Sequence, residues 1–101
     1  MLSELTVADF SPHVGQMFLA EVTGVAPIDL ELVRATELAP ASRPNPESRQ
    51  PFSLLFLGPP SDHYLPQRTY RLEHAQMGDL DIFLVPLGPI DQRMQYEAIF
   101  T

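Results

Sequence analysis

Short runs in which apolar and polar side chains alternate dominate the sequence, and they limit the folds that it can adopt. The clearest run is PIDLELVRATEL (residues 27–38), where Ile28, Leu30 and Leu32 fall on one side of an extended chain and acidic residues fall between them. A period of two places one set of side chains in a core and the other in solvent. The pattern therefore predicts a β-strand with one wet face.

Similar runs recur along the chain and indicate about six strands in all. The others are QMFLAEVT (residues 16–23), PFSLLFLG (51–58), TYRLEH (69–74), LDIFLVP (80–86) and MQYEAIF (94–100). The run that reaches Gly58 is expected to stop there because Pro59 and Pro60 have no backbone N–H for a sheet. Most connections are turns, among them one around Gly78, and turns join antiparallel strands. We therefore predict an all-β fold, a single small antiparallel barrel or sandwich.

Before the first strand, two short segments have the residue pattern of helical turns. Thr6 and Asp9 have the spacing of a capping box, in which each side chain pairs with the backbone amide of the other residue. In the next segment Ser11 can cap a turn, Pro12 suits its first position, and Gly15 can adopt the left-handed exit conformation. The fold is thus expected to begin with a short N-terminal helical turn.

The length of 101 residues suits one hydrophobic core, so residues 1–101 are predicted to form a single domain. Residues 39–51 contain four prolines and no large apolar side chain. Such a segment can neither join a sheet nor bury area, so it is interpreted as a mobile surface loop. A loop of this length is usually either functional or disordered.

The charge and the missing residue types exclude several classes of function. The net charge is −7, with six arginines and no lysine, so phosphate backbones and anionic lipid surfaces would repel the chain. Without cysteine, disulfides, thiolate metal sites and cysteine nucleophiles are excluded. No segment approaches the roughly 18 apolar residues that cross a bilayer, and the N-terminus has no basic leader. The sequence predicts a soluble, cytoplasmic protein with no nucleic acid and no membrane as partner.

Three histidines raise the question of a metal site. Zinc or iron needs imidazole and carboxylate ligands that converge, commonly with short local spacing, and no such motif occurs. Convergence would require residues 61–67 to fold over the turn at residues 75–79. The ligands would then be Asp62, His63, His74 and Asp79. We predict no metal and no cofactor, because a histidine that ends a strand usually caps a turn or bonds a carbonyl.

The sequence offers no strong catalytic constellation. Ser53, His74 and Asp79 could form a hydrolytic triad on paper, but there is no G-x-S-x-G elbow, and Ser53 lies within an apolar run. The five glycines are scattered, and none opens a long helix that could hold a phosphate. No catalytic residue is therefore assigned, and the chain is predicted not to be an enzyme.

Arg68, Arg71 and Arg93 are candidates for an anion-binding patch, because guanidinium groups pair well with carboxylates and phosphates. Arg71 alternates with Glu73, however, and cross-strand pairs of arginine and acid on a wet face need no function to explain them. These polar residues are therefore interpreted as the outer surface of a β-hairpin.

One loop stands out as a candidate contact surface for a partner. In SDHYLP, Tyr64 and Leu65 lie between polar and proline residues, whereas most other aromatic residues are at core-facing positions. The two side chains could anchor a protein partner, or they could fold back and plug one end of a barrel. With the polar residues nearby, the candidate partner contacts are His63, Tyr64, Leu65, Arg68 and His74.

The order of several segments resembles a known family. VGQMF, PFSLLF, LPQRTYRLEHAQMG, DIFLVPLG and YEAIF follow one another as in a family of bacterial proteins of similar length, classed as a domain of unknown function. The most specific part is LPQ-x-x-Y-x-L-E-H followed by G-x-L-x-I-F-L-V-P-L-G. The resemblance supports the fold and implies no activity, cofactor or catalytic residue. It also suggests an accessory or assembly factor encoded beside phage-tail-collar-like proteins.

Two hypotheses for the function remain. The leading one is a non-enzymatic interaction or assembly accessory module that contacts a protein partner, or another copy of itself. The contact would use a sheet edge, the proline-rich loop or the loop at Tyr64. The second is a barrel that binds a small ligand or a metal at one mouth, with His63, His74, Tyr64 and Arg68 around it. The two hypotheses differ in whether those side chains converge.

Overall fold

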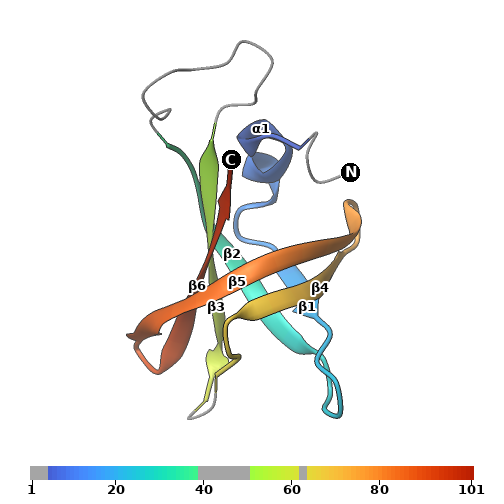
Figure 1. Ribbon diagram of the computed structural model, residues 1–101, viewed down its shortest axis with the longest axis vertical. Coiled ribbons are helices and arrows are strands. Elements are labelled where there is room, and N and C mark those ends of the chain that lie inside the picture. Colours follow the sequence, from blue (N-terminus) through green and yellow to red (C-terminus); the bar gives the residue numbers. More distant parts are fainter. Residues whose placement is uncertain (1–4, 39–50, 62–63) are drawn as a thin grey trace.

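The predicted strands close into one antiparallel barrel. The computed structural model describes residues 5–38, 51–61 and 64–101, and Figure 1 shows its elements. The strands are β1 (Met17–Ala20), β2 (Ile28–Glu37), β3 (Phe52–Pro60), β4 (Arg68–His74), β5 (Gly78–Ile90) and β6 (Arg93–Phe100). Their order around the barrel is β1-β2-β3-β6-β5-β4, and every neighbouring pair is antiparallel. The all-β prediction is confirmed, and the architecture is the barrel rather than the sandwich.

The predicted helical turns also form at the start of the chain. They are α1 (Val7–Phe10) and the 3₁₀ helix η2 (Ser11–His13). The amide of Thr6 donates to a carboxylate oxygen of Asp9 over 2.7 Å, as expected of a capping box. Gly15 ends the segment in the left-handed region, with φ at +92°. Among the described residues, no helix has the length and apolar character that crossing a bilayer requires.

Several strand boundaries differ from the predicted ones: β1 ends at Ala20 rather than at Thr23, and the C-terminal ends of β3 and β5 differ at prolines. The predicted end of the third strand at Gly58 is wrong, because β3 continues until Pro60 pairs with Arg93 across a register shift. Likewise β5 extends beyond the predicted residues 80–86 at both ends and passes Pro86 through a second register shift. A proline lacks only the N–H and keeps its carbonyl, so a strand can accommodate it at a bulge. Apart from Pro51, the loop predicted at residues 39–51 lies outside the described residues.

Alternate side chains of the strands fill the barrel, as the sequence pattern predicts. On β2 the side chains of Leu30 and Leu32 are buried, and on β4 those of Tyr70 and His74 face the core. Burial of each large apolar side chain stabilises the fold by about 1.5–3 kcal/mol. Phe83 on β5 is different, because 49% of its surface is exposed. The prediction that most phenylalanines are core residues is confirmed, and Phe83 is the exception.

The helical segment closes one end of the barrel through Phe10, which is fully buried. The centroid of its ring lies 5.8 Å from that of Phe52 on β3 and 5.7 Å from that of Phe100 on β6. The rings of Phe52 and Phe100 stack on each other nearly in parallel, with centroids 4.6 Å apart. Three aromatic rings from distant parts of the chain thus form the plug at this end.

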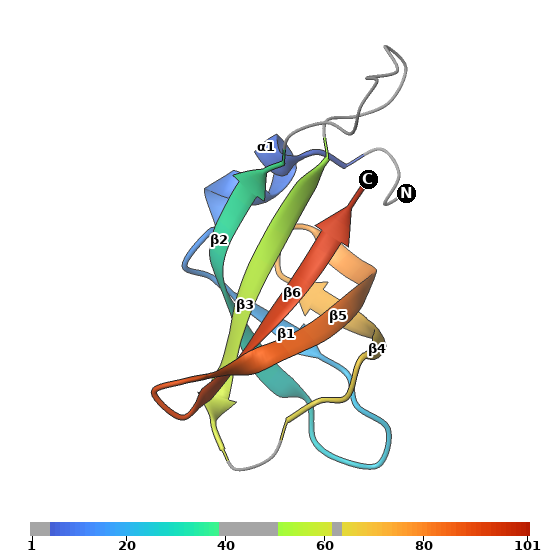
Figure 2. The same cartoon turned by 60° about the vertical axis from the view of Figure 1, so that its left-hand side comes forward.

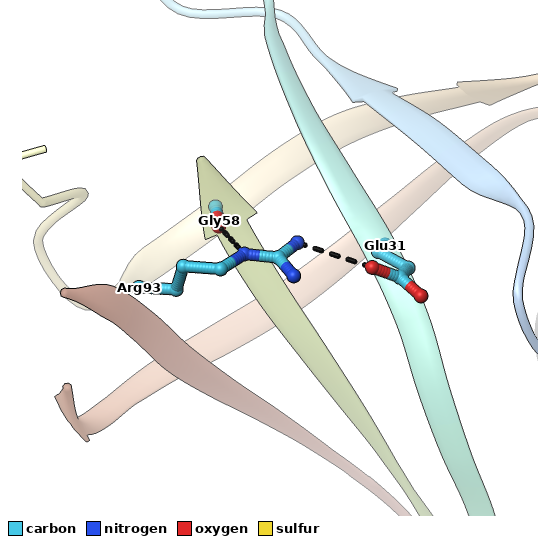
Figure 3. Close-up of polar contacts among 3 residues, drawn as sticks. All are labelled: Glu31, Gly58 and Arg93. Atoms are coloured by element: carbon cyan, nitrogen blue, oxygen red, sulfur yellow. Dashed lines mark hydrogen bonds and ion pairs between the residues drawn. The ribbon is translucent and has the colours of Figure 1, made fainter. Parts of the chain in front are cut away.

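Arg93 ties three strands together across the outer face of the barrel near the other end. It lies at the start of β6, and its Nε donates to the carbonyl of Gly58 on β3 over 2.7 Å (Figure 3). Its Nη2 forms an ion pair with Glu31 on β2 over 3.1 Å, and both side chains are only 28% exposed. This partly buried pair of charges, with a backbone partner for the guanidinium, fixes β3 between β2 and β6.

The role of the plug can be tested with two substitutions of the same residue type. Phe10→Ala should lower the free energy of unfolding by about 3–5 kcal/mol, because it leaves a cavity among buried rings. Phe83→Ala should lower it by less than about 1 kcal/mol, because half of that side chain is already in water. Urea denaturation followed by circular dichroism measures both values. Equal losses for the two variants would contradict the packing described above.

Candidate functional site

The strands β5 and β6 pair along only part of their length. Their ladder begins at Val85 and Glu97 and continues to the turn at residues 91–92. Before Val85, β5 pairs with β4. β6 pairs with β3 on both sides of Glu97, and after Glu97 it has no second partner among the described strands. Figure 2 shows β5 and β6 diverging with distance from the hairpin that joins them. We call the opening between residues 79–83 of β5 and residues 98–99 of β6 the seam.

The seam is an apolar groove with exposed walls. Its volume is about 290 Å³, and its floor includes Ile82 and Ala98, which belong to the buried core. Phe83 forms one wall and is 49% exposed, while Ile99 forms the other and is 51% exposed. A large apolar side chain that is half exposed on an outer barrel face gains only part of the stabilisation of burial, and two of them beside a groove are typical of a contact surface.

The backbone along the seam belongs to strand edges. In an antiparallel ladder, every second residue directs its N–H and C=O to one neighbour and the others direct theirs to the opposite side. Between residues 79 and 83, β5 has β4 on one side and, within the described residues, no paired strand on the other. Such an edge can accept a further strand, which would continue the hydrogen-bond ladder.

Acidic side chains predominate on the outer face beside the seam. Asp81 lines the groove and forms an exposed ion pair with Arg71 over 3.2 Å. Asp79 lies opposite Glu73 in the β4–β5 ladder, and Glu73 in turn meets Glu21. The hydrogen bond between the carboxyls of Glu73 and Glu21 raises the pKa of Glu73, and its partial desolvation adds to this effect. Carboxylates therefore outnumber the guanidinium group here, which gives this face a negative potential.

Tyr64 and Leu65, the predicted anchors, lie together at the end of the barrel away from α1. The amide of Leu65 donates to the hydroxyl of Tyr96 over 2.8 Å, and its side chain is buried. Tyr64 is 59% exposed at the rim of a cavity. Leu65 thus folds back into the barrel, whereas Tyr64 stays in solvent, and contact of Tyr64 with a partner stays a prediction.

The structure does not bring Arg68 and His74 to a common mouth. Arg68 begins β4 and His74 ends it. Since a strand advances by about 3.3 Å per residue, the two positions lie about 20 Å apart. His63 lies outside the described residues, as does Asp62. A single mouth that includes both Arg68 and His74 is therefore wrong.

His74 supports the β4–β5 turn from inside the barrel. Its Nδ1 accepts the amides of Gln76 and Met77 over 3.1 and 3.2 Å, and its ring stacks on Phe18 with centroids 4.5 Å apart. Its Nε2 lies 2.6 Å from the side-chain oxygen of Gln16, which is also 2.9 Å from Nδ1 of His13. Two amide donors at Nδ1 fix the neutral ring with its proton on Nε2. This is a turn-capping role, as expected for a histidine at the end of a strand.

The other candidate constellations do not assemble among the described residues. Ser53 lies on the outer side of β3 between Thr36 and Ile99, whereas His74 is buried inside, so the hydrolytic triad does not form. In the part of the chain that the structure describes, no group of three histidine, aspartate or glutamate side chains is arranged to hold a metal ion. Arg71 and Arg93 each pair with an acid instead of forming an anion site with Arg68.

Phe83 and Ile99 are exposed on the surface, although neither is among the contact residues predicted from the sequence. A signal for them exists, because IFLV in β5 and AIF in β6 have apolar residues at consecutive positions. A strand with one wet face should alternate, so a continuous apolar run indicates that both faces have apolar neighbours. Nothing in the run itself tells whether the second face meets a strand of the same chain.

Residues 5–100 match the family described as a domain of unknown function, DUF6916, and the chain belongs to this family. No curated protein and no solved structure gives a match. The resemblance to an uncharacterised family, which the sequence segments indicated, is confirmed at this level. Membership brings no activity with it, so the function must be argued from the geometry.

The state of His74 predicts how stability depends on pH. Burial lowers the pKa of His74, and the nearby His13 lowers it further. The unfolded chain, with an ordinary histidine pKa of about 6.5, therefore binds a proton more readily than the folded one. The stabilising contribution is complete above about pH 6.5 and is lost as the pH falls below that value.

Thermal melts between about pH 8 and pH 5 of the natural chain and of His74→Gln provide the measurement, since this window lies above most carboxyl titrations. The natural chain should lose more stability than the variant as the pH falls. His13→Gln is the matched control, because it removes the neighbouring imidazole and keeps His74. If the melting temperatures of the natural chain and of His74→Gln fell in parallel with pH, His74 would have the same pKa in the folded and the unfolded chain, and the prediction would be wrong.

Proposed function

We propose that this chain is a non-enzymatic interaction module that binds an extended segment of a protein partner along the seam. The observation that supports this most directly is the end of the β5–β6 ladder at Val85 and Glu97. It leaves a strand edge on β5 beside two exposed apolar side chains, Phe83 and Ile99. This is a form of the sheet-edge contact, one of the three contacts that the sequence analysis left open.

The partner segment adds to β5 as an antiparallel strand. Backbone hydrogen bonds to residues 79–83 supply most of the affinity and are independent of the partner's sequence. Its alternate side chains point to the outer face, where they contact Phe83, and toward Ile99 on the opposite wall. Specificity therefore comes from the residues at every second position of the segment, which share its outer face: apolar ones meet Phe83 and Ile99, and basic ones meet the neighbouring carboxylates.

The acidic surroundings favour a basic partner. Asp79, Asp81 and Glu73 lie on the same outer face, and Arg71 is the cation that the structure places among them. The net charge of the chain is −7, so it also attracts a basic segment from a distance. Another copy of this chain would bring acid against acid, which makes self-association through the seam unfavourable.

The finer predictions from the sequence fit such a module. An assembly accessory of a bacterial cytoplasm would hold a segment of another protein without chemical change, and strand addition does this. Neither the compartment nor the association with phage-tail-like proteins is needed for the proposal, which depends on the seam alone.

A peptide binding experiment tests the proposal without knowledge of the natural partner. The probe is a short capped peptide in which every second residue is alanine, and the residues between, which share one face of the strand, are valine and lysine in turn; titration calorimetry measures its affinity. The same peptide with glutamate in place of lysine tests the charge argument and should bind at least about tenfold more weakly. The valine–lysine peptide with central N-methyl groups cannot complete the ladder and should not bind.

Matched variants locate the binding site. The double variant Phe83→Ala, Ile99→Ala should bind the valine–lysine peptide about tenfold or more weakly, since both apolar walls of the seam are lost. Met17→Ala removes an equally exposed side chain on β1 and should change the affinity by less than about twofold. Equal binding of the N-methylated peptide, or a dimer in light scattering that the Phe83 and Ile99 changes dissociate, would overturn the proposal.

A further inference from the structure

A second apolar space lies at one end of the barrel, lined by the β1–β2 connection, the end of β3, residues 64–66 and the start of β6. The volume of this cavity is about 580 Å³. Its main lining side chains are Val25, Ile28, Tyr64, Leu65, Met94 and Tyr96. It is separate from the seam, because Met94 and Tyr96 lie near the start of β6 and the seam lies near its end.

The lining determines what the cavity can hold. No charged side chain of the described residues lines it, and apolar side chains from four segments surround it. The described lining offers no partner to an ion that has lost its hydration, so it favours an uncharged occupant. Cavities of roughly 300–1,000 Å³ hold small organic molecules in other proteins. Size and chemistry together indicate a neutral, largely apolar small molecule.

One polar group points to a specific feature of that molecule. Tyr96 is 3% exposed, and its hydroxyl accepts the amide hydrogen of Leu65 over 2.8 Å. A tyrosine hydroxyl also donates one hydrogen bond, and the described residues provide no acceptor for it. Tyr70 differs, since its hydroxyl donates to the carbonyl of Pro66 over 2.6 Å. Burial raises the pKa of Tyr96, so its hydroxyl keeps its proton and can donate it.

The wall that holds Tyr96 is fixed before any ligand arrives. A Cβ atom at Gly58 would come within 3.3 Å of a ring carbon of Tyr96, so glycine gives the ring its space. The carbonyl of Gly58 accepts from Arg93, which is anchored on Glu31 (Figure 3). A preformed wall lowers the entropy lost on binding.

We propose that this cavity binds an uncharged, mostly apolar small molecule whose carbonyl or other acceptor oxygen takes the hydrogen bond of the Tyr96 hydroxyl. Tyr64 and Val25 at the rim, both largely exposed, cover the ligand from the solvent side. The site differs from the seam in its place and in its occupant, so either can exist without the other.

A matched pair of probes tests the cavity and the hydrogen bond separately. 2-Acetylnaphthalene has a carbonyl, and 2-ethylnaphthalene has the same ring system without one. Titration by NMR should show both probes shifting the resonances of Val25, Ile28 and Met94, with the ketone binding several-fold more tightly. Tyr96→Phe should lower the affinity for the ketone by about three- to tenfold, which corresponds to the loss of one hydrogen bond. It should change the affinity for the hydrocarbon by less than about twofold.

Two controls separate this effect from damage to the fold. Tyr70→Phe removes a hydroxyl that is already used elsewhere, and it should leave both probes unchanged. Ala26→Trp should fill the cavity and abolish binding of both probes while the valine–lysine peptide still binds at the seam. The proposal is overturned if neither probe shifts the cavity resonances of the natural chain. It is equally overturned if Tyr96→Phe weakens both probes alike, since the hydroxyl would then act only through Leu65.

Discussion

The exchange of partners along β5 is the constraint from which the candidate site follows. Up to Leu84 this strand pairs with β4, and from Val85 it pairs with β6. A long strand that serves two neighbours in succession lets a small number of strands close a barrel, but it cannot fill both ladders at every position. Residues 79–83, which among the described residues have no ladder partner on the side of β6, form one wall of the seam. Its exposed edge is therefore a consequence of closure, and the apolar residues placed there are the feature that calls for a functional explanation.

The sequence predicts the elements of this barrel well and their ends less well. Alternation places Leu30 and Leu32 inside correctly, because the period of a strand fixes the side of each residue. Rules about proline place the end of β3 too early, since a bulge allows Pro60 to pair with Arg93. Strand order cannot be obtained in this way, because it depends on contacts between residues far apart in the chain.

For the candidate site, too, the sequence predicts what depends on a local pattern and misses what depends on contacts between distant segments. Tyr64 and Leu65 were identifiable from one loop, since local sequence shows an aromatic residue outside any strand pattern. Arg68 and His74 were grouped because they are near in sequence, yet the length of β4 holds them apart. Phe83 and Ile99 meet only because β5 and β6 are neighbours in the barrel. Reasoning that depends on the partner of a strand needs the topology, whereas reasoning about a single strand does not.

The most direct measurement for the central claim is native-state hydrogen exchange along β5, resolved by residue. The account predicts that seam-facing amides between residues 79 and 83 exchange much faster than the amides of Val85 and the residues after it that pair with β6. These fast amides should become protected when the valine–lysine peptide is added. Uniformly slow exchange along β5 in the free protein would contradict the account, because it would mean that the edge is already paired.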